Sequence, residues 1–160
     1  MTMTKTAAGG ARPQIGDLLP DFAAQTVDGR MIQRREFKGR RHLVVCCAHP
    51  EALDSGRDLL TALAGRYTAI REERGELLFL PARGEVGGID PGPFPIVVDA
   101  TPSLRARFGA AESALLLIAD RYGEVVLREE SAGRAGSAGA ALPLERIVPM
   151  LAWLEMRCSL

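Results

Sequence analysis

Apolar residues along this chain form short continuous runs, separated by longer stretches of mixed character. Short runs of β-branched and other apolar residues, bounded by turn-forming residues, are typical of strands. The run at 42–48 is apolar after its first residue and suits a central parallel strand buried on both faces. Runs of these kinds predict strands or extended segments at 22–25, 31–33, 42–48, 76–81, 95–98, 115–118 and 124–128.

Turn-forming residues connect two pairs of these runs. Asp28-Gly29 lies between the first two runs and predicts a hairpin, and residues 120–123 predict a four-residue turn between the last two. Glycine and proline are frequent in 84–94, and Gly, Ala and Ser dominate 131–141. These two stretches are predicted to be loops.

Apolar residues spaced three and four positions apart predict three helices. The first is expected over residues 54–74, with Gly75 at the position of a helix stop. A short helix is expected near residues 102–108. The last is expected over residues 143–157, where Pro149 should either kink the helix or mark its true start.

The order of these elements predicts the fold class. Two strands separated by one helix form a parallel pair with a right-handed crossover, and the final hairpin adds antiparallel strands. The result is an α/β protein with a central mixed β-sheet flanked by helices and an N-terminal β-hairpin, which is the thioredoxin-like arrangement. The chain has 160 residues, enough for one domain. We expect that domain over residues 13–160, after a disordered tail at 1–12.

Composition excludes several classes of function. The 20 basic and 20 acidic residues balance, so no overall field attracts nucleic acid or an anionic membrane. No apolar run reaches the roughly 18 residues of a membrane span, and we expect a cytoplasmic protein. Ligand spacings for zinc and a phosphate-binding loop are both missing. We therefore expect no metal, no cofactor, no nucleic-acid partner and no membrane.

A series of short motifs indicates a family. They are Gly16, Pro20-Asp21-Phe22, Asp28-Gly29, Phe37-Lys38-Gly39, the strand at 43–48 with Pro50, Asp99, Phe108-Gly109, and Asp120 with Gly123. With these markers the chain resembles the alkyl hydroperoxide reductase and thiol-specific antioxidant branch of the peroxiredoxin and thioredoxin-like superfamily, over roughly residues 13–130. Such a resemblance implies a thioredoxin-like fold and, in active members, reduction of peroxides by a cysteine thiolate.

The same resemblance implies that the active site is degenerate. Active members carry a proline, a threonine four residues later and the reactive cysteine three residues after that. Here Pro50 is kept, but Asp54 and Arg57 stand at the threonine and cysteine positions. A thioredoxin-type alignment places Glu51 and Asp54 at its two cysteine positions. The arginine or cis-proline of active members is also missing from residues 109–114.

Three cysteines remain as candidate thiols, too few for a disulfide scaffold. Cys46 and Cys47 are neighbours on a predicted strand and so face opposite sides of the sheet. One interpretation is that both are buried apolar side chains. The other is that Cys47 is a catalytic thiol that reaches the loop after the strand. Cys158 is either an incidental thiol near the end of the chain or a second catalytic or resolving cysteine.

The loop after the predicted strand at 42–48 carries several polar residues, and we call it the site loop. One interpretation makes its side chains an acid–base or ligand-binding set. The other interpretation gives them local structural roles. Asp54 caps the helix, and the negative charge of Glu51 interacts favourably with the positive N-terminal end of the helix dipole. His42 is expected at the far end of the strand from this loop. The residues in question are His49, Pro50, Glu51, Asp54 and Arg57.

Three functions remain open on the sequence. The first is a peroxiredoxin-like protein without the usual reactive cysteine, serving as a non-catalytic binding or assembly module or as a weak redox protein. The second is an active thiol-dependent antioxidant oxidoreductase that uses Cys47 or Cys158. The third is a free-standing relative of the thioredoxin-like assembly domain of flavin-dependent aromatic hydroxylases. A homodimer and a complex with another protein are both compatible with these readings.

Overall fold

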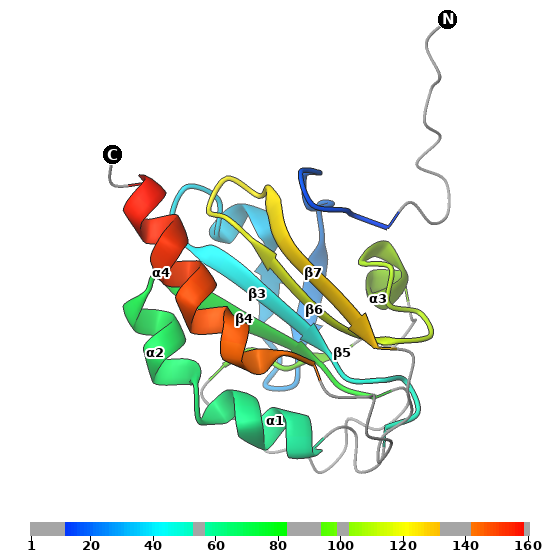
Figure 1. Cartoon of the computed structure of the whole chain (residues 1–160). Coiled ribbons are helices and arrows are strands. Elements are labelled where there is room, and N and C mark those ends of the chain that lie inside the picture. The colour runs from blue at the N-terminus through cyan, green and yellow to red at the C-terminus, as the bar shows by residue number, and fades with distance from the viewer. Residues whose placement is uncertain (1–11, 53–56, 83–93, 99–102, 132–141, 159–160) are drawn as a thin grey trace, which may run out of the picture.

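The centre of the molecule is a four-stranded mixed sheet. The computed structural model describes residues 12–52, 57–82, 94–98, 103–131 and 142–158 (Figure 1). Strand β3 pairs in parallel with β4 and antiparallel with β6, and β6 pairs antiparallel with β7. The strands, in their order across the sheet, are β4 (Gly75–Leu80), β3 (His42–Cys47), β6 (Ala114–Ala119) and β7 (Val125–Ser131).

Alternate residues of each central strand enter two separate cores. On one face, Val44 and Cys46 of β3 pack against side chains of the helices α1 (Arg57–Ala64), α2 (Tyr67–Glu72) and α4 (Ile147–Cys158). Val45 and Cys47 enter the other core, together with the N-terminal hairpin and α3 (Ser103–Arg107). Figure 1 shows the two layers on opposite sides of the sheet. The predicted α/β class, with its mixed sheet flanked by helices, is confirmed.

The N-terminal hairpin belongs to a small sheet of its own. It consists of β1 (Ala23–Thr26) and β2 (Met31–Gln33), and Gly29 in its turn has φ 87°. The third strand of this sheet is β5 (Val97–Val98), which pairs antiparallel with β1. One residue earlier, Ile96 forms a parallel bridge to Phe79 of β4. The segment predicted as a strand at 95–98 therefore connects the small sheet to the central one.

The prediction of one helix over 54–74 is wrong. Two helices, α1 and α2, occupy this region and are separated by Gly65 and Arg66. Glycine disfavours a helix interior by about 1 kcal/mol relative to alanine, which allows the break. The apolar pattern continues across the break because Leu63 of α1 and Ile70 of α2 are both fully buried in the same core.

Gly75 is also not the helix stop that the sequence suggests. Arg74 takes the left-handed conformation at the end of α2, with φ 57°, and Gly75 is the first residue of β4. A Cβ atom at Gly75 would lie 2.8 Å from both Ile70 Cγ2 and Leu151 Cδ1. Glycine is needed here because α2, α4 and the sheet approach closely, rather than for its backbone freedom.

The last helix confirms one of the two roles considered for Pro149. A 3-10 turn (Leu144–Arg146) precedes α4, and Pro149 lies in the first turn of α4. The N–H groups of a first turn have no partner inside the helix, so a proline there costs little. None of the described helices is long and apolar enough to cross a membrane.

Some predictions fall outside the described residues. The tail at 1–11, most of the loops at 84–94 and 131–141, and Asp54 are among them. Arg12, at the boundary expected for the tail, is described, and its guanidinium pairs with Glu130 at 3.1 Å. The extent of the domain remains a prediction.

Candidate functional site

The site loop leaves the carboxyl end of β3 and turns sharply. Ala48 still follows the sheet, because its N–H donates to the carbonyl of Leu80 at 2.9 Å. The next residues form a turn in which the N–H of Ala52 donates to the carbonyl of His49 at 2.9 Å. The N–H of Glu51 donates to His49 Nδ1 at 3.0 Å. The imidazole thus closes its own turn, and Nδ1 is not available as a base.

The predicted members of the site loop have unequal access to solvent. His49 is only 8% exposed and Pro50 is buried, whereas Glu51 and Arg57 are exposed. Arg57 is the first residue of α1. The structure therefore places an arginine at the start of the helix that follows the site loop. Asp54, between these residues, lies outside the described ranges.

The two adjacent cysteines are enclosed in the sheet. Cys46 and Cys47 are both 0% exposed and lie in different cores, as neighbours on a strand should. Burial raises the pKa of Cys46 well above its usual value, and the neighbouring Cys47 adds to this shift. A thiol in such surroundings stays protonated and is a poor nucleophile.

Cys158 lies at the opposite end of the sheet from the site loop. Its side chain hydrogen-bonds to that of Arg121, and this bond raises the pKa of Arg121. Arg121 is in the turn between β6 and β7, and its backbone N–H donates to His42 Nδ1 at 3.0 Å. Because His42 begins β3 and the site loop follows its end, the full length of the strand separates Cys158 from the loop. None of the three cysteines is in a disulfide.

Beneath the site loop lies a buried cation that the sequence analysis did not single out. Arg105 of α3 is 3% exposed. One terminal nitrogen donates to the carbonyls of Ala48 at 2.5 Å and Pro81 at 3.0 Å. The other donates to those of Ala110 at 3.0 Å and Ser113 at 3.2 Å. The guanidinium therefore joins the ends of β3 and β4 to the segment between α3 and β6.

The contacts of Arg105 limit what it can do chemically. A guanidinium has two N–H groups on each terminal nitrogen, and all four are directed at backbone carbonyls. Arg105 therefore has no terminal N–H left to orient a substrate. A signal for its burial was present in the sequence, since Leu104, Arg105 and Phe108 lie on one side of a helix. Charged residues are seldom fully buried, which makes this signal easy to discount.

Comparison with solved structures places this geometry in a known fold. A reduced 2-Cys peroxiredoxin of Plasmodium vivax superposes with a TM-score of 0.72, at 14% identity, covering 91% of this chain and 99% of that one. The mitochondrial 2-Cys peroxiredoxin of Plasmodium falciparum gives a TM-score of 0.69, at 13% identity, covering 91% and 96%. The chain has the peroxiredoxin fold. No protein-family model and no curated protein sequence matches it.

A third similar structure is an N-terminally modified peroxiredoxin of Plasmodium yoelii, which forms an artifactual octamer. It superposes with a TM-score of 0.68, at 14% identity, covering 91% of this chain and 94% of that one. Identities this low establish the shared fold alone. Within this peroxiredoxin fold, residues 48–57 contain no cysteine. In the described part of the chain, no group of three or more His, Cys, Asp or Glu residues could hold a metal ion.

Proposed function

We propose that this protein is a peroxiredoxin-fold binding or assembly module that does not carry out thiol peroxidase chemistry. The placement of the three thiols carries this proposal. Cys46 and Cys47 are fully buried in the central strand, and Cys158 lies at the far end of the sheet from the site loop. No thiol is therefore positioned where the loop after β3 meets α1.

Exposing Cys47 to a peroxide would require opening the middle of the sheet. Its strand, β3, is hydrogen-bonded to β4 on one side and to β6 on the other. Opening the central strands of a domain costs free energy close to that of global unfolding. Turnover through Cys47 is therefore disfavoured because peroxide cannot reach the thiol in the folded state.

The buried cation beneath the site loop is already engaged in hydrogen bonds to the backbone. Arg105 lies under the loop, but its terminal N–H groups are all donated to carbonyls. Preorganised donors directed at the reacting oxygen are a large part of such catalysis. The arrangement around Ala48 and Arg105 supports a structural role for this end of the molecule.

The test combines turnover with thiol accessibility. Purified protein should consume neither hydrogen peroxide nor an organic hydroperoxide when dithiothreitol or a thioredoxin system supplies electrons. Titration of native protein with a thiol reagent should give no more than one fast-reacting group, Cys158, and two more after unfolding. Peroxide turnover that is lost in Cys47→Ala would overturn the proposal. The matched variant Cys46→Ala controls for loss of packing.

A second candidate function is thiol exchange through Cys158. The observation that favours it is the contact with Arg121, because reactive cysteines often lie beside a cation. Cys158 is half-buried rather than enclosed. If this candidate is correct, Cys158→Ser should abolish formation of mixed disulfides with small disulfides, whereas Cys47→Ala should not.

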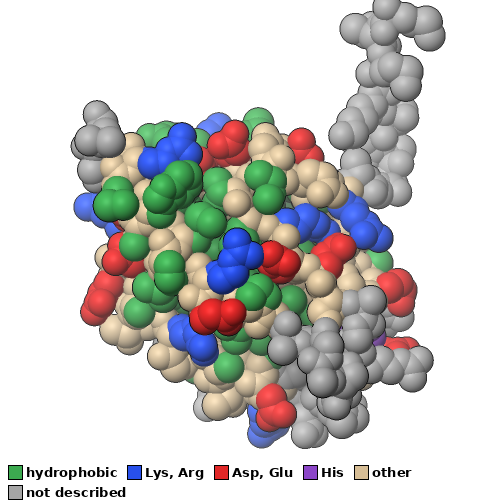
Figure 2. All heavy atoms as spheres, viewed as in Figure 1, with side chains coloured by type: hydrophobic (Ala, Val, Ile, Leu, Met, Phe, Trp, Pro, Cys, Tyr) green, Lys and Arg blue, Asp and Glu red, His purple; other side chains and the backbone are tan. Residues whose placement is uncertain are grey.

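A binding module needs a surface for its partner, and α4 offers one. Apolar side chains lie among charged ones over α4 (Figure 2), where Trp153 is 44% and Met156 66% exposed. The guanidinium of Arg157 lies 4.8 Å from the centre of the Trp153 ring. We propose that this face contacts a second copy of the chain or another protein. Light scattering over a range of concentrations, with Trp153→Ser as the variant, tests self-association.

A further inference from the structure

Basic residues gather at the end of the sheet opposite the site loop. The segment that leads into β3 carries five of them between residues 34 and 41. Strand pairing places Arg74 beside this segment, because His42 is in register with Gly75. It also brings Arg121 close, because Leu43 is in register with Ala119. Cations are therefore concentrated at this end, although Arg74 pairs there with Glu155 at 3.8 Å.

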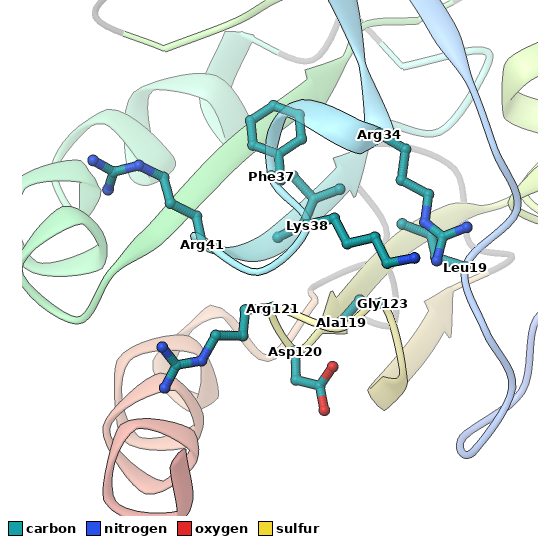
Figure 3. Close-up of a pocket in the computed structure, with 10 residues that line it drawn as sticks. Leu19, Arg34, Phe37, Lys38, Arg41, Ala119, Asp120, Arg121 and Gly123 are labelled. Atoms are coloured by element: carbon teal, nitrogen blue, oxygen red, sulfur yellow. The ribbon is translucent and has the colours of Figure 1, made fainter. Parts of the chain in front are cut away.

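An open hollow lies among these basic residues (Figure 3). It is a shallow depression that is open to solvent rather than an enclosed cavity, with a volume of about 10 Å³. Its wall is closed on one side by a backbone hydrogen bond of 2.6 Å from the N–H of Gly39 to the carbonyl of Arg121. The polar residues that line it are Arg34, Lys38, Arg41, Arg121 and Asp120, and the apolar ones include Leu19, Leu43 and Ala119.

Two of the cations are directed into the hollow. In Figure 3 the side chains of Arg34 and Lys38 converge over it, whereas those of Arg41 and Arg121 extend to the side. No hydrogen bond or ion pair joins the Lys38 ammonium group to any described residue. The Nε atom of Arg121 is buried and likewise has no partner in the described part of the chain. Of these groups, the Lys38 ammonium is the one that lies over the hollow and can bind an anion.

Arg34 is held in a fixed position. Its guanidinium lies against Gly123, where a Cβ atom would collide with it. It also pairs with Asp21 at 3.1 Å, but the Asp21 side chain is almost fully exposed, so this pair contributes little. A planar guanidinium fixed in this way matches the geometry of a phosphate group.

Asp120, the carboxylate that lines the hollow, stabilises a turn of the backbone. Asp120 Oδ1 accepts the N–H groups of Tyr122 at 2.9 Å and Glu124 at 3.0 Å, which forms the turn between β6 and β7. Its charge opposes an anion, but the two cations directed into the hollow outnumber it. We propose that this hollow binds a phosphate anion, free or at the end of a small molecule, with Arg34 and Lys38 contacting the phosphate group.

Two neighbouring residues allow a matched test. Lys38 and Arg40 are both exposed and lie in the same turn, but only Lys38 lines the hollow. We would titrate the full chain with phenyl phosphate and with inorganic phosphate, following amide chemical shifts by NMR. Both phosphates should bind saturably at the same residues, and added salt should weaken both.

Three variants distinguish a specific binding site from diffuse electrostatic attraction. Lys38→Ala should weaken binding about fivefold to tenfold, because one charge-assisted hydrogen bond is lost. Arg40→Ala removes the same charge and should weaken binding less than about twofold. Asp120→Asn keeps the acceptor oxygen of the turn and should strengthen binding.

Three results would overturn the proposal. The first is the absence of saturable binding by both phosphates. The second is an equal loss of affinity in Lys38→Ala and Arg40→Ala, which would indicate only diffuse attraction. The third is binding of an oligonucleotide or of anionic vesicles without any binding of phenyl phosphate, which would indicate a macromolecular surface instead.

Discussion

Arg105 is the residue on which the end of the sheet most depends. Its four carbonyl partners belong to three different segments, and each is left without its charged donor if the side chain is removed. Hydrogen bonds to a charged group are stronger than neutral ones, and an unsatisfied buried carbonyl costs free energy. One side chain thus holds the ends of β3 and β4 in position beneath the site loop.

Arg105→Ala should therefore lower the free energy of unfolding by about 3 kcal/mol or more. Arg107 on the same helix provides the control, since it is exposed and donates only to the carbonyl of Asp21 at 2.9 Å. Arg107→Ala should cost less than about 1 kcal/mol. Urea unfolding followed by circular dichroism measures both. Similar losses in the two variants would show that Arg105 is not a structural tie.

At the scale of the elements, two glycines that flank α2 act in opposite ways. An added Cβ at Gly65 would meet nothing closer than Ala62 O at 3.7 Å, an ordinary contact. At Gly75 it would clash with side chains and lie 3.0 Å from the carbonyl oxygen of Ile70. Gly65 therefore separates two helices at a point with room to spare, whereas Gly75 allows α2, α4 and β4 to meet.

Gly65→Ala should stabilise the fold by about 0.5 to 1 kcal/mol, because alanine restricts the unfolded chain and fits the available space. Gly75→Ala should destabilise it by about 1 to 3 kcal/mol through overpacking. The same denaturant measurement compares the two variants. Stabilisation by Gly75→Ala would contradict the close approach of the three elements.

The element scale also shows what the sequence could predict. The apolar runs of β3, β4 and β6 give unmistakable strands because both faces of the sheet are buried. The break at Gly65 could not be predicted from periodicity, since Leu63 and Ile70 continue one buried face across it. The pairing of β5 with β1, and the meeting of Arg121 with Cys158, depend on tertiary contacts that no local pattern contains.

At the scale of the whole molecule, the phenol of Tyr67 makes the free energy of unfolding depend on pH in the alkaline range. Tyr67 donates to Glu76 Oε1 at 2.8 Å, and the same carboxylate pairs with Arg71 at 2.7 Å. Burial, followed by the bond to Glu76, raises the pKa of Tyr67 from 10.0 to about 12. The folded state therefore favours the protonated phenol. This contribution to stability is complete below the pKa that Tyr67 has in the unfolded chain. It is lost as pH rises through the pKa of Tyr67 in the folded state.

Stability should consequently fall between about pH 10 and pH 12. Tyr67→Phe should show a smaller fall over this range, because phenylalanine has no proton to lose. In Tyr122→Phe, which leaves Tyr67 as the single tyrosine, phenolate absorbance of the native protein should rise with a midpoint near pH 12. A pH dependence identical in wild type and Tyr67→Phe would refute the assignment.

The adjacent cysteines of β3 offer a way to measure the two halves of the molecule separately. Cys46 faces the helices and Cys47 faces the hairpin, and neither is exposed in the folded state. In single-cysteine variants, the rate of alkylation of each thiol reports how often its own side of the sheet opens. Two equal rates would mean that the helical layer and the hairpin layer unfold together. Unequal rates would identify which layer detaches first and by how much free energy.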